Sequence, residues 1–76
     1  MDSKLKQQKI NLWKKQEAEL QKKLEETLKR KGAAAQEGDL RENAAYQMAG
    51  EEAEVISARL GSIQRMIADL EKDEGE

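Results

Sequence analysis

The middle of the chain, residues 38–46, reads Gly-Asp-Leu-Arg-Glu-Asn-Ala-Ala-Tyr and separates two long segments of helical composition. Gly38 favours a backbone with positive φ, which commonly ends a helix. Asp39 is a favourable N-cap residue, and Glu42, three residues later, completes a pattern similar to a capping box. The stretch therefore predicts a chain reversal, with a tip over about residues 36–39 and a second helix that begins at about residue 40.

The second half of the chain has a clear hydrophobic pattern. Its apolar residues recur at alternating steps of three and four, which is typical of the seam of a coiled coil. The seam residues are Tyr46, Ala49, Ala53, Ile56, Leu60, Ile63, Ile67 and Leu70. We expect a helix over about residues 40–72, with residues 73–76 as a frayed end or the start of a linker.

The first half is less regular and is expected to form a helix over about residues 3–35. Its apolar side is supplied by Leu5, Ile10, Trp13, Leu20, Leu24 and Leu28. The same steps of three and four, extended from Trp13, pass through Glu17, Leu20, Leu24, Thr27, Lys31 and Ala34. Glu17 and Lys31 are polar interruptions, which can fix the register of a coiled coil at some cost in stability. The two halves together predict an all-α fold, an antiparallel two-helix coiled-coil hairpin that forms a single domain over residues 1–76.

The net charge of −2 conceals an asymmetry between the two halves. Residues 1–38 contain ten Lys or Arg and six Asp or Glu, whereas residues 39–76 contain four and ten. Halves of opposite sign attract each other when they lie antiparallel. Because a two-helix hairpin has a thin core, we also expect it to form a homodimer or to dock its base on another surface.

Composition excludes several classes of function. The chain has no His, Cys or Pro, so it lacks the commonest general base, disulfides and cysteine-based zinc sites. No apolar run is long enough for a signal peptide or a membrane span, and we expect a cytoplasmic protein without a membrane partner. A pI of ≈ 5.3 and the lack of an aromatic stacking surface argue against direct binding of nucleic acid. We do not expect the chain to be an enzyme by itself.

Asp39 and Glu42 are the candidate functional pair. Their spacing places both carboxylates on one face of a helix. Steps of four and three backward from Tyr46 lead to Glu42 and Asp39, so we expect both on the inner stripe, at the end where the partner helix runs out. Exposed carboxylates there can supply part of the octahedral oxygen ligation that Mg²⁺ prefers. The alternative is that the two acids only cap the helix.

The nine residues of the tip resemble the tip motif of the bacterial Gre transcript-cleavage factors (GreA and GreB), Gly-Asp-Leu-x-Glu-Asn-Ala-Glu-Tyr, and the likeness covers about residues 36–70. The resemblance implies a coiled coil that enters the secondary channel of bacterial RNA polymerase and promotes cleavage of backtracked RNA near the nascent 3′ end. By matching position, Asp39 and Glu42 would hold a Mg²⁺ jointly with the polymerase, with none bound by the chain alone. The residues that would shape the tip are Gly38, Leu40, Asn43 and Tyr46.

The chain departs from the motif of the Gre factors at several positions. Ala45 replaces the third acid of the tip, and neither Ala35 nor Gly50 is one of the basic residues often found there to meet the RNA. The run Lys29-Arg30-Lys31 is a candidate for contact with RNA phosphates, the alternative being an ordinary solvated face. Two further functions stay open at this point. One is a channel occupant that modulates or inhibits the polymerase without cleavage, and the other is a plain coiled-coil assembly module.

Overall fold

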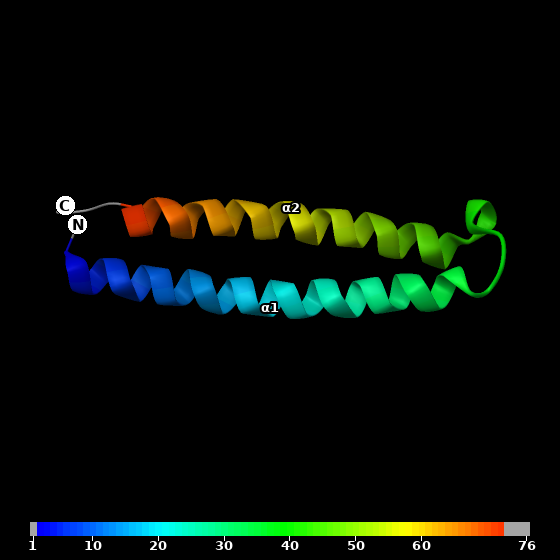
Figure 1. Cartoon of the computed structure of the whole chain (residues 1–76), viewed down its shortest axis with the longest axis horizontal. Helices are drawn as coiled ribbons and strands as arrows, with labels where there is room; N and C mark the ends of the chain where they lie inside the picture. Colours follow the sequence, from blue (N-terminus) through cyan, green and yellow to red (C-terminus); the bar gives the residue numbers. More distant parts are fainter. Residues whose placement is uncertain (1, 73–76) are drawn as a thin grey trace.

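The computed structural model describes residues 2–72 as an antiparallel pair of long helices (Figure 1). Helix α1 spans Ser3–Ala35 and α2 spans Ala44–Lys72, with a short 3-10 helix, η1, at Leu40–Glu42 between them. The rod measures 56 × 15 × 12 Å. The described residues contain no strand, and the predicted all-α hairpin is confirmed. The predicted tail, residues 73–76, lies outside the described residues.

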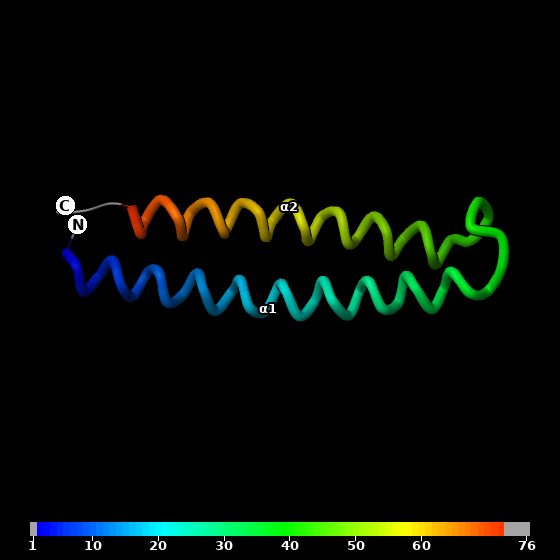
Figure 2. The backbone as a smooth tube through the Cα atoms, in the orientation of Figure 1, coloured from blue at the N-terminus to red at the C-terminus, as the bar shows by residue number. Residues whose placement is uncertain are grey.

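The two helices lie side by side along their whole length (Figure 2). The first turn of α1 and the last turn of α2 share one end of the rod, which we call the base, and the chain reversal forms the tip. Each helix therefore has only the other to pack against, and each buries one narrow stripe. Among the described residues, no helix is both long enough and apolar enough to cross a membrane.

The predicted seam of α2 is confirmed by burial. Tyr46 and Leu70 at its two ends are half-buried, and every seam position between them is buried. These buried residues are Ala49, Ala53, Ile56, Leu60, Ile63 and Ile67. The seam is thus built from alanine near the tip and from larger aliphatic side chains toward the base.

The seam of α1 follows the same steps of three and four despite its polar members. Its buried or half-buried residues are Lys6, Ile10, Trp13, Glu17, Leu20, Leu24, Thr27, Lys31 and Ala34. Thr27 is 1% exposed, and its Oγ1 accepts a hydrogen bond of 3.2 Å from Nη2 of Arg30, so the buried hydroxyl is satisfied. Leu5 and Leu28, which the sequence placed on the apolar side, are exposed. Leu28 directly follows Thr27, and the rotation of 100° per residue takes it out of the seam.

Two ion pairs join the basic first helix to the acidic second helix. Nη2 of Arg30 lies 2.9 Å from Oε2 of Glu52, and Nζ of Lys14 lies 3.2 Å from Oε2 of Glu71. All four side chains are more than a third exposed, so each pair contributes only on the order of 0–1 kcal/mol. Their main effect is on orientation, since they match the opposite charges of the two halves.

The long second helix begins at Ala44 instead of at about residue 40. Asn43 has φ −98° and ψ 96°, which is extended backbone and interrupts the helical path after Glu42. The residues from Leu40 to Glu42 form the separate η1, so the sequence pattern starting at Asp39 nucleates a short helix and not the long one.

We expect Ile63→Ala to lower the free energy of unfolding by about 2–5 kcal/mol, because it leaves a cavity in a core that is one seam wide. Ile63 is 3% exposed. Thermal and urea denaturation followed by circular dichroism measure the loss. Gln64→Ala, an exposed change one residue away, is the matched control and should leave the midpoint nearly unchanged. Equal effects of the two substitutions would contradict the seam described above.

Candidate functional site

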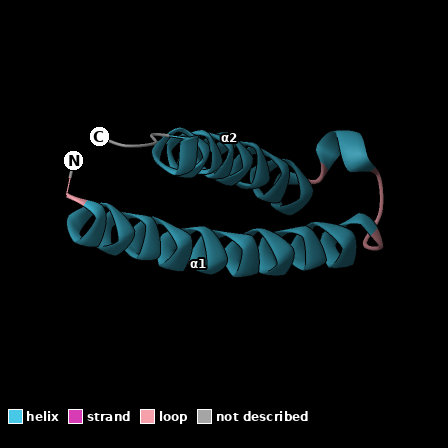
Figure 3. Cartoon of the chain, turned by 60° about the vertical axis from the view of Figure 1, so that its left-hand side comes forward, coloured by secondary structure: helices cyan, strands magenta, loops and turns pink. Residues whose placement is uncertain are grey.

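The chain reverses at the tip through a tightened last turn of α1. The backbone N–H of Gln36 donates to the carbonyl oxygen of Ala33 at 3.3 Å, and that of Glu37 donates to the carbonyl oxygen of Ala34 at 3.1 Å. Gly38 follows with φ +140°, a conformation that residues with a Cβ rarely adopt. The predicted positive φ at Gly38 is confirmed, and it turns the chain out of α1 toward η1 (Figure 3).

Asp39 caps the short helix η1. Its Oδ1 accepts a hydrogen bond of 3.0 Å from the backbone N–H of Arg41 and lies 3.4 Å from Nε of the same residue. The backbone N–H of Glu42 donates to the carbonyl oxygen of Asp39 at 3.2 Å. The expectation that these two acids cap the long second helix is therefore wrong, because Asp39 lies four residues before the N-cap position of α2.

Asn43 is the residue that caps α2 and joins the two long helices. Its Oδ1 accepts a hydrogen bond of 3.0 Å from the backbone N–H of Tyr46, the usual bond of an N-cap. Its Nδ2 donates to the carbonyl oxygen of Ala34 at 2.6 Å. One amide thus satisfies a free donor at the start of α2 and binds a carbonyl in the last turn of α1. Asn is a preferred N-cap residue, so the sequence does contain a marker for this helix start. The pattern of Asp39 and Glu42 matches a capping box more closely and predicts the start there instead.

Two further contacts hold the start of α2 against its neighbours. Nε2 of Gln47 donates to the carbonyl oxygen of Arg41 at 3.0 Å, which fastens η1 to the first turn of α2. Nζ of Lys31 lies 5.2 Å from the centre of the Tyr46 ring, a cation–π distance. Sequence reasoning did not identify Gln47, because a contact between its side chain and a backbone carbonyl six residues earlier has no sequence signature.

The two acids stand on the outside of the tip. The break at Asn43 takes Asp39 and Glu42 off the seam, so the expectation that they occupy the inner stripe is wrong. Both are exposed, and they border a shallow hollow with Glu37 and Ala44. Residues 2–72 contain no group of three or more metal-binding side chains. The pair is therefore at most a partial set of ligands that is open to a second molecule.

The remaining predicted site residues lie at or near the tip but do not form one surface. Leu40 lies on η1 and is exposed. In the basic run, Lys29 pairs with Glu25 at 3.5 Å, Arg30 pairs with Glu52, and Lys31 stacks on Tyr46. Consecutive helical residues point about 100° apart, so these three cations face different directions. Contact of this run with RNA stays a prediction.

Residues 2–72 thus form an antiparallel helical hairpin with two exposed acids at its closed end. The model of the family described as "Transcription elongation factor, N-terminal", the N-terminal domain of GreA and GreB, matches residues 4–71. The chain belongs to this family, whose members are accessory, non-catalytic domains that act with RNA polymerase. Comparison with curated proteins gives no significant match, and neither does comparison with solved structures.

We expect Gly38→Ala to lower the free energy of unfolding by about 1–2 kcal/mol, because an L side chain is disfavoured at positive φ. A Cβ at Gly38 would meet nothing within 4 Å, so the cost arises from the backbone alone. Gly32→Ala is the matched control. It also meets nothing within 4 Å but lies inside α1, where we expect a gain of about 0.5–1 kcal/mol. Denaturation midpoints that shift in the same direction for both variants would contradict the assigned turn.

We expect Asn43→Ala to cost more stability than Asn43→Ser, by about 1 kcal/mol, since serine keeps the N-cap acceptor. Both variants lose the amide that reaches Ala34, so the difference between the native chain and Asn43→Ser measures the bond between the two helices. Urea denaturation of the three proteins gives the values. Native-like stability of Asn43→Ser would show that the link to Ala34 contributes nothing.

Proposed function

We propose that the hairpin enters the secondary channel of RNA polymerase with its tip leading and presents Asp39 and Glu42 to the active centre, where they promote cleavage of backtracked RNA. The observation that supports this most directly is the placement of the two carboxylates. Both are exposed at the closed end of a rod 56 Å long, where Asp39 caps a separate short helix and Glu42 is its last residue. The rod supplies reach, and the bonds of Asn43 and Gln47 supply a fixed position for the acids.

The donor set at the tip fits one side of a Mg²⁺ site. Asp39 uses Oδ1 for the backbone of Arg41, which leaves its Oδ2 free, and within residues 2–72 the Glu42 carboxylate makes no hydrogen bond or ion pair. Hard carboxylate oxygens with open positions are typical ligands of Mg²⁺ when phosphate or other carboxylates complete the shell. When bound there, the ion would lower the pKa of a bound water and stabilise the developing charge. The role of this chain is to hold and orient its two carboxylates, and we expect no measurable Mg²⁺ binding by the chain alone.

A second candidate is a channel occupant that slows the polymerase without cleavage. Ala45 follows Glu42 by three residues and supplies no third carboxylate, and Nε of Arg41 lies 3.4 Å from Oδ1 of Asp39. Both features lower the negative charge at the tip. If two carboxylates are too few to recruit the ion, the same rod blocks the channel without supplying chemistry.

We expect Asp39→Asn and Glu42→Gln each to reduce cleavage of backtracked RNA on the order of 100-fold, because each removes one charged group that would act on the transition state. The assay adds the purified chain to halted, backtracked complexes of a bacterial RNA polymerase and follows the RNA on a gel. Glu51→Gln, which removes an exposed acid from α2 beyond the tip, is the control and should cleave normally. Circular dichroism verifies that all three variants remain helical.

The same experiment separates the proposal from its competitors. Binding of the native chain that slows elongation without producing cleaved RNA would favour the channel occupant. Failure to bind the polymerase at all would contradict both functions and leave a coiled-coil assembly module.

A further inference from the structure

One side of the rod carries most of its exposed large apolar residues. In both helices, a residue that directly precedes a seam residue lies on one side of an antiparallel coiled coil, and a residue that directly follows lies on the other. We call the first side the Arg30 face, because Arg30 and Glu52 both precede seam residues and pair there. Five large apolar residues with at least a third of their surface exposed belong to this face: Leu5, Leu12, Met48, Val55 and Met66. Among residues 2–72, the opposite side has Leu28 alone.

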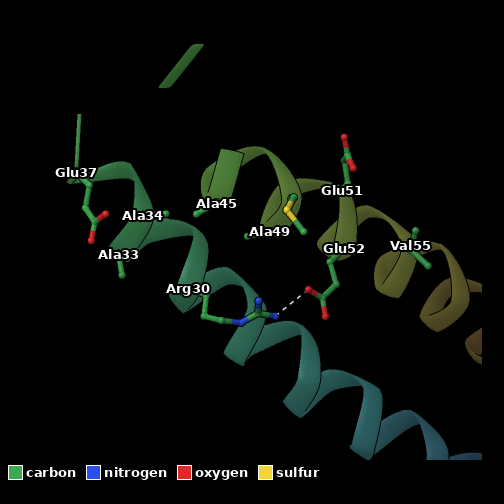
Figure 4. Close-up of a pocket in the computed structure, with 10 residues that line it drawn as sticks. Arg30, Ala33, Ala34, Glu37, Ala45, Ala49, Glu51, Glu52 and Val55 are labelled. Carbon is green, nitrogen blue, oxygen red and sulfur yellow. Dashed lines mark hydrogen bonds and ion pairs between the residues drawn. The ribbon is translucent and has the colours of Figure 1, made fainter. Parts of the chain in front are cut away.

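Near the tip, the Arg30 face forms an apolar groove between the two helices (Figure 4). Ala33 of α1 and Ala45 of α2 form its walls, and Val55 stands at its far end. Met48 and Val55 are 68% and 67% exposed, so two large apolar side chains of this small protein lie outside its core. The pair of Arg30 and Glu52 crosses this groove. A surface with apolar walls and a paired charge in the middle resembles an interface and not an ordinary solvated face.

We infer that the Arg30 face binds a second copy of this chain, with the two tips at the same end, to form a four-helix bundle. In this arrangement the twofold axis runs along the rod, and α1 of each copy lies over α2 of the other. The basic half of one copy then faces the acidic half of its partner. The inference concerns the chain by itself and does not rest on the proposed function.

The charges on the face select this orientation. With both tips together, residues of α1 face residues of α2 that lie at the same height on the rod. The lining of shared grooves shows which residues lie at similar heights: Arg30 and Glu52 line one groove, and Glu19, Lys23 and Arg59 line another. Lys9 and Asp69, which also directly precede seam residues, add a cation of α1 and an acid of α2 to this face toward the base. Arg30 of one copy would thus face Glu52 of the other with opposite charge. Arg59 would face Glu19, of opposite sign, and Lys23, of the same sign.

The apolar residues agree with the same arrangement. Met48 and Val55 of one copy would cover Ala33 of the other near the tip. Leu12 lies near the level of Met66, so these two side chains would meet across the dimer near the base. The reverse orientation, tip to base, places α1 on α1 and α2 on α2. At full overlap it brings Arg30 near Lys9 and Glu52 near Asp69, which are like charges.

Sedimentation equilibrium over a wide range of concentrations tests the dimer. Val55→Glu should raise the dissociation constant by about tenfold or more, because it buries an unpaired carboxylate in each half of the interface. Ala58→Glu, an exposed change of equal charge on the back of the same helix, is the control and should change the constant by less than about threefold. A chain that stays monomeric at every concentration, or a dimer equally insensitive to both substitutions, overturns the inference.

A single spin label tests the orientation. The chain contains no cysteine, so Gln36→Cys gives one label at the tip of each copy. Tips at the same end place the two labels far closer together than the 56 Å length of the rod. A distance near that length between the two labels, measured by pulsed electron–electron double resonance, would show the reverse orientation and overturn the inferred arrangement. Binding to RNA polymerase is measured in a separate experiment. A negative result for the dimer therefore leaves the proposed function untouched, and a negative result with the polymerase leaves the dimer untouched.

Discussion

The fold depends on how two helix ends are satisfied where the chain turns. The last carbonyls of α1 and the first N–H groups of α2 have no partners within their own helices. The backbone N–H of Glu37 donates to the carbonyl oxygen of Ala34, which also accepts from the side chain of Asn43. The side chain of Asn43 serves both, since it accepts from Tyr46 and donates to Ala34. These bonds tie the start of α2 to the end of α1, at the end of the rod where the seam begins.

The long-range architecture was predictable because it is encoded by periodicity. The seam of α2 is continuous in apolar residues, and the seam of α1 could be followed through Glu17, Thr27 and Lys31 by spacing alone. The details of the tip were less accessible. The local pattern of Asp39 and Glu42 is a valid helix start, and nothing within the sequence shows that it starts η1 and that Asn43 then starts α2. The decisive contact of Asn43 joins residues nine apart across the turn.

The position of the acids also depended on this detail. Counting back along the seam assumes that one helix continues through residues 39–46, and the extended backbone of Asn43 ends that continuity. The acids are displaced from the seam to the outside of the tip, where solvent or a partner can reach both of them. The exposed pair is therefore consistent with membership of the elongation-factor family. The backbone that holds the pair is a short helix and an extended Asn43, not the continuous helix that periodicity predicts.

Because the seam is continuous, the length of the rod can change in steps of one heptad. Each heptad adds about 10 Å of length and returns every side chain to the same side. Removal of one heptad from each helix would thus withdraw the tip by that distance without rotating it, whereas removal of fewer residues would turn η1 about the rod axis. The distance of Asp39 and Glu42 from the base and the direction in which they point are consequently separate quantities in this protein. The number of whole heptads sets the first, and the residues beyond whole heptads set the second.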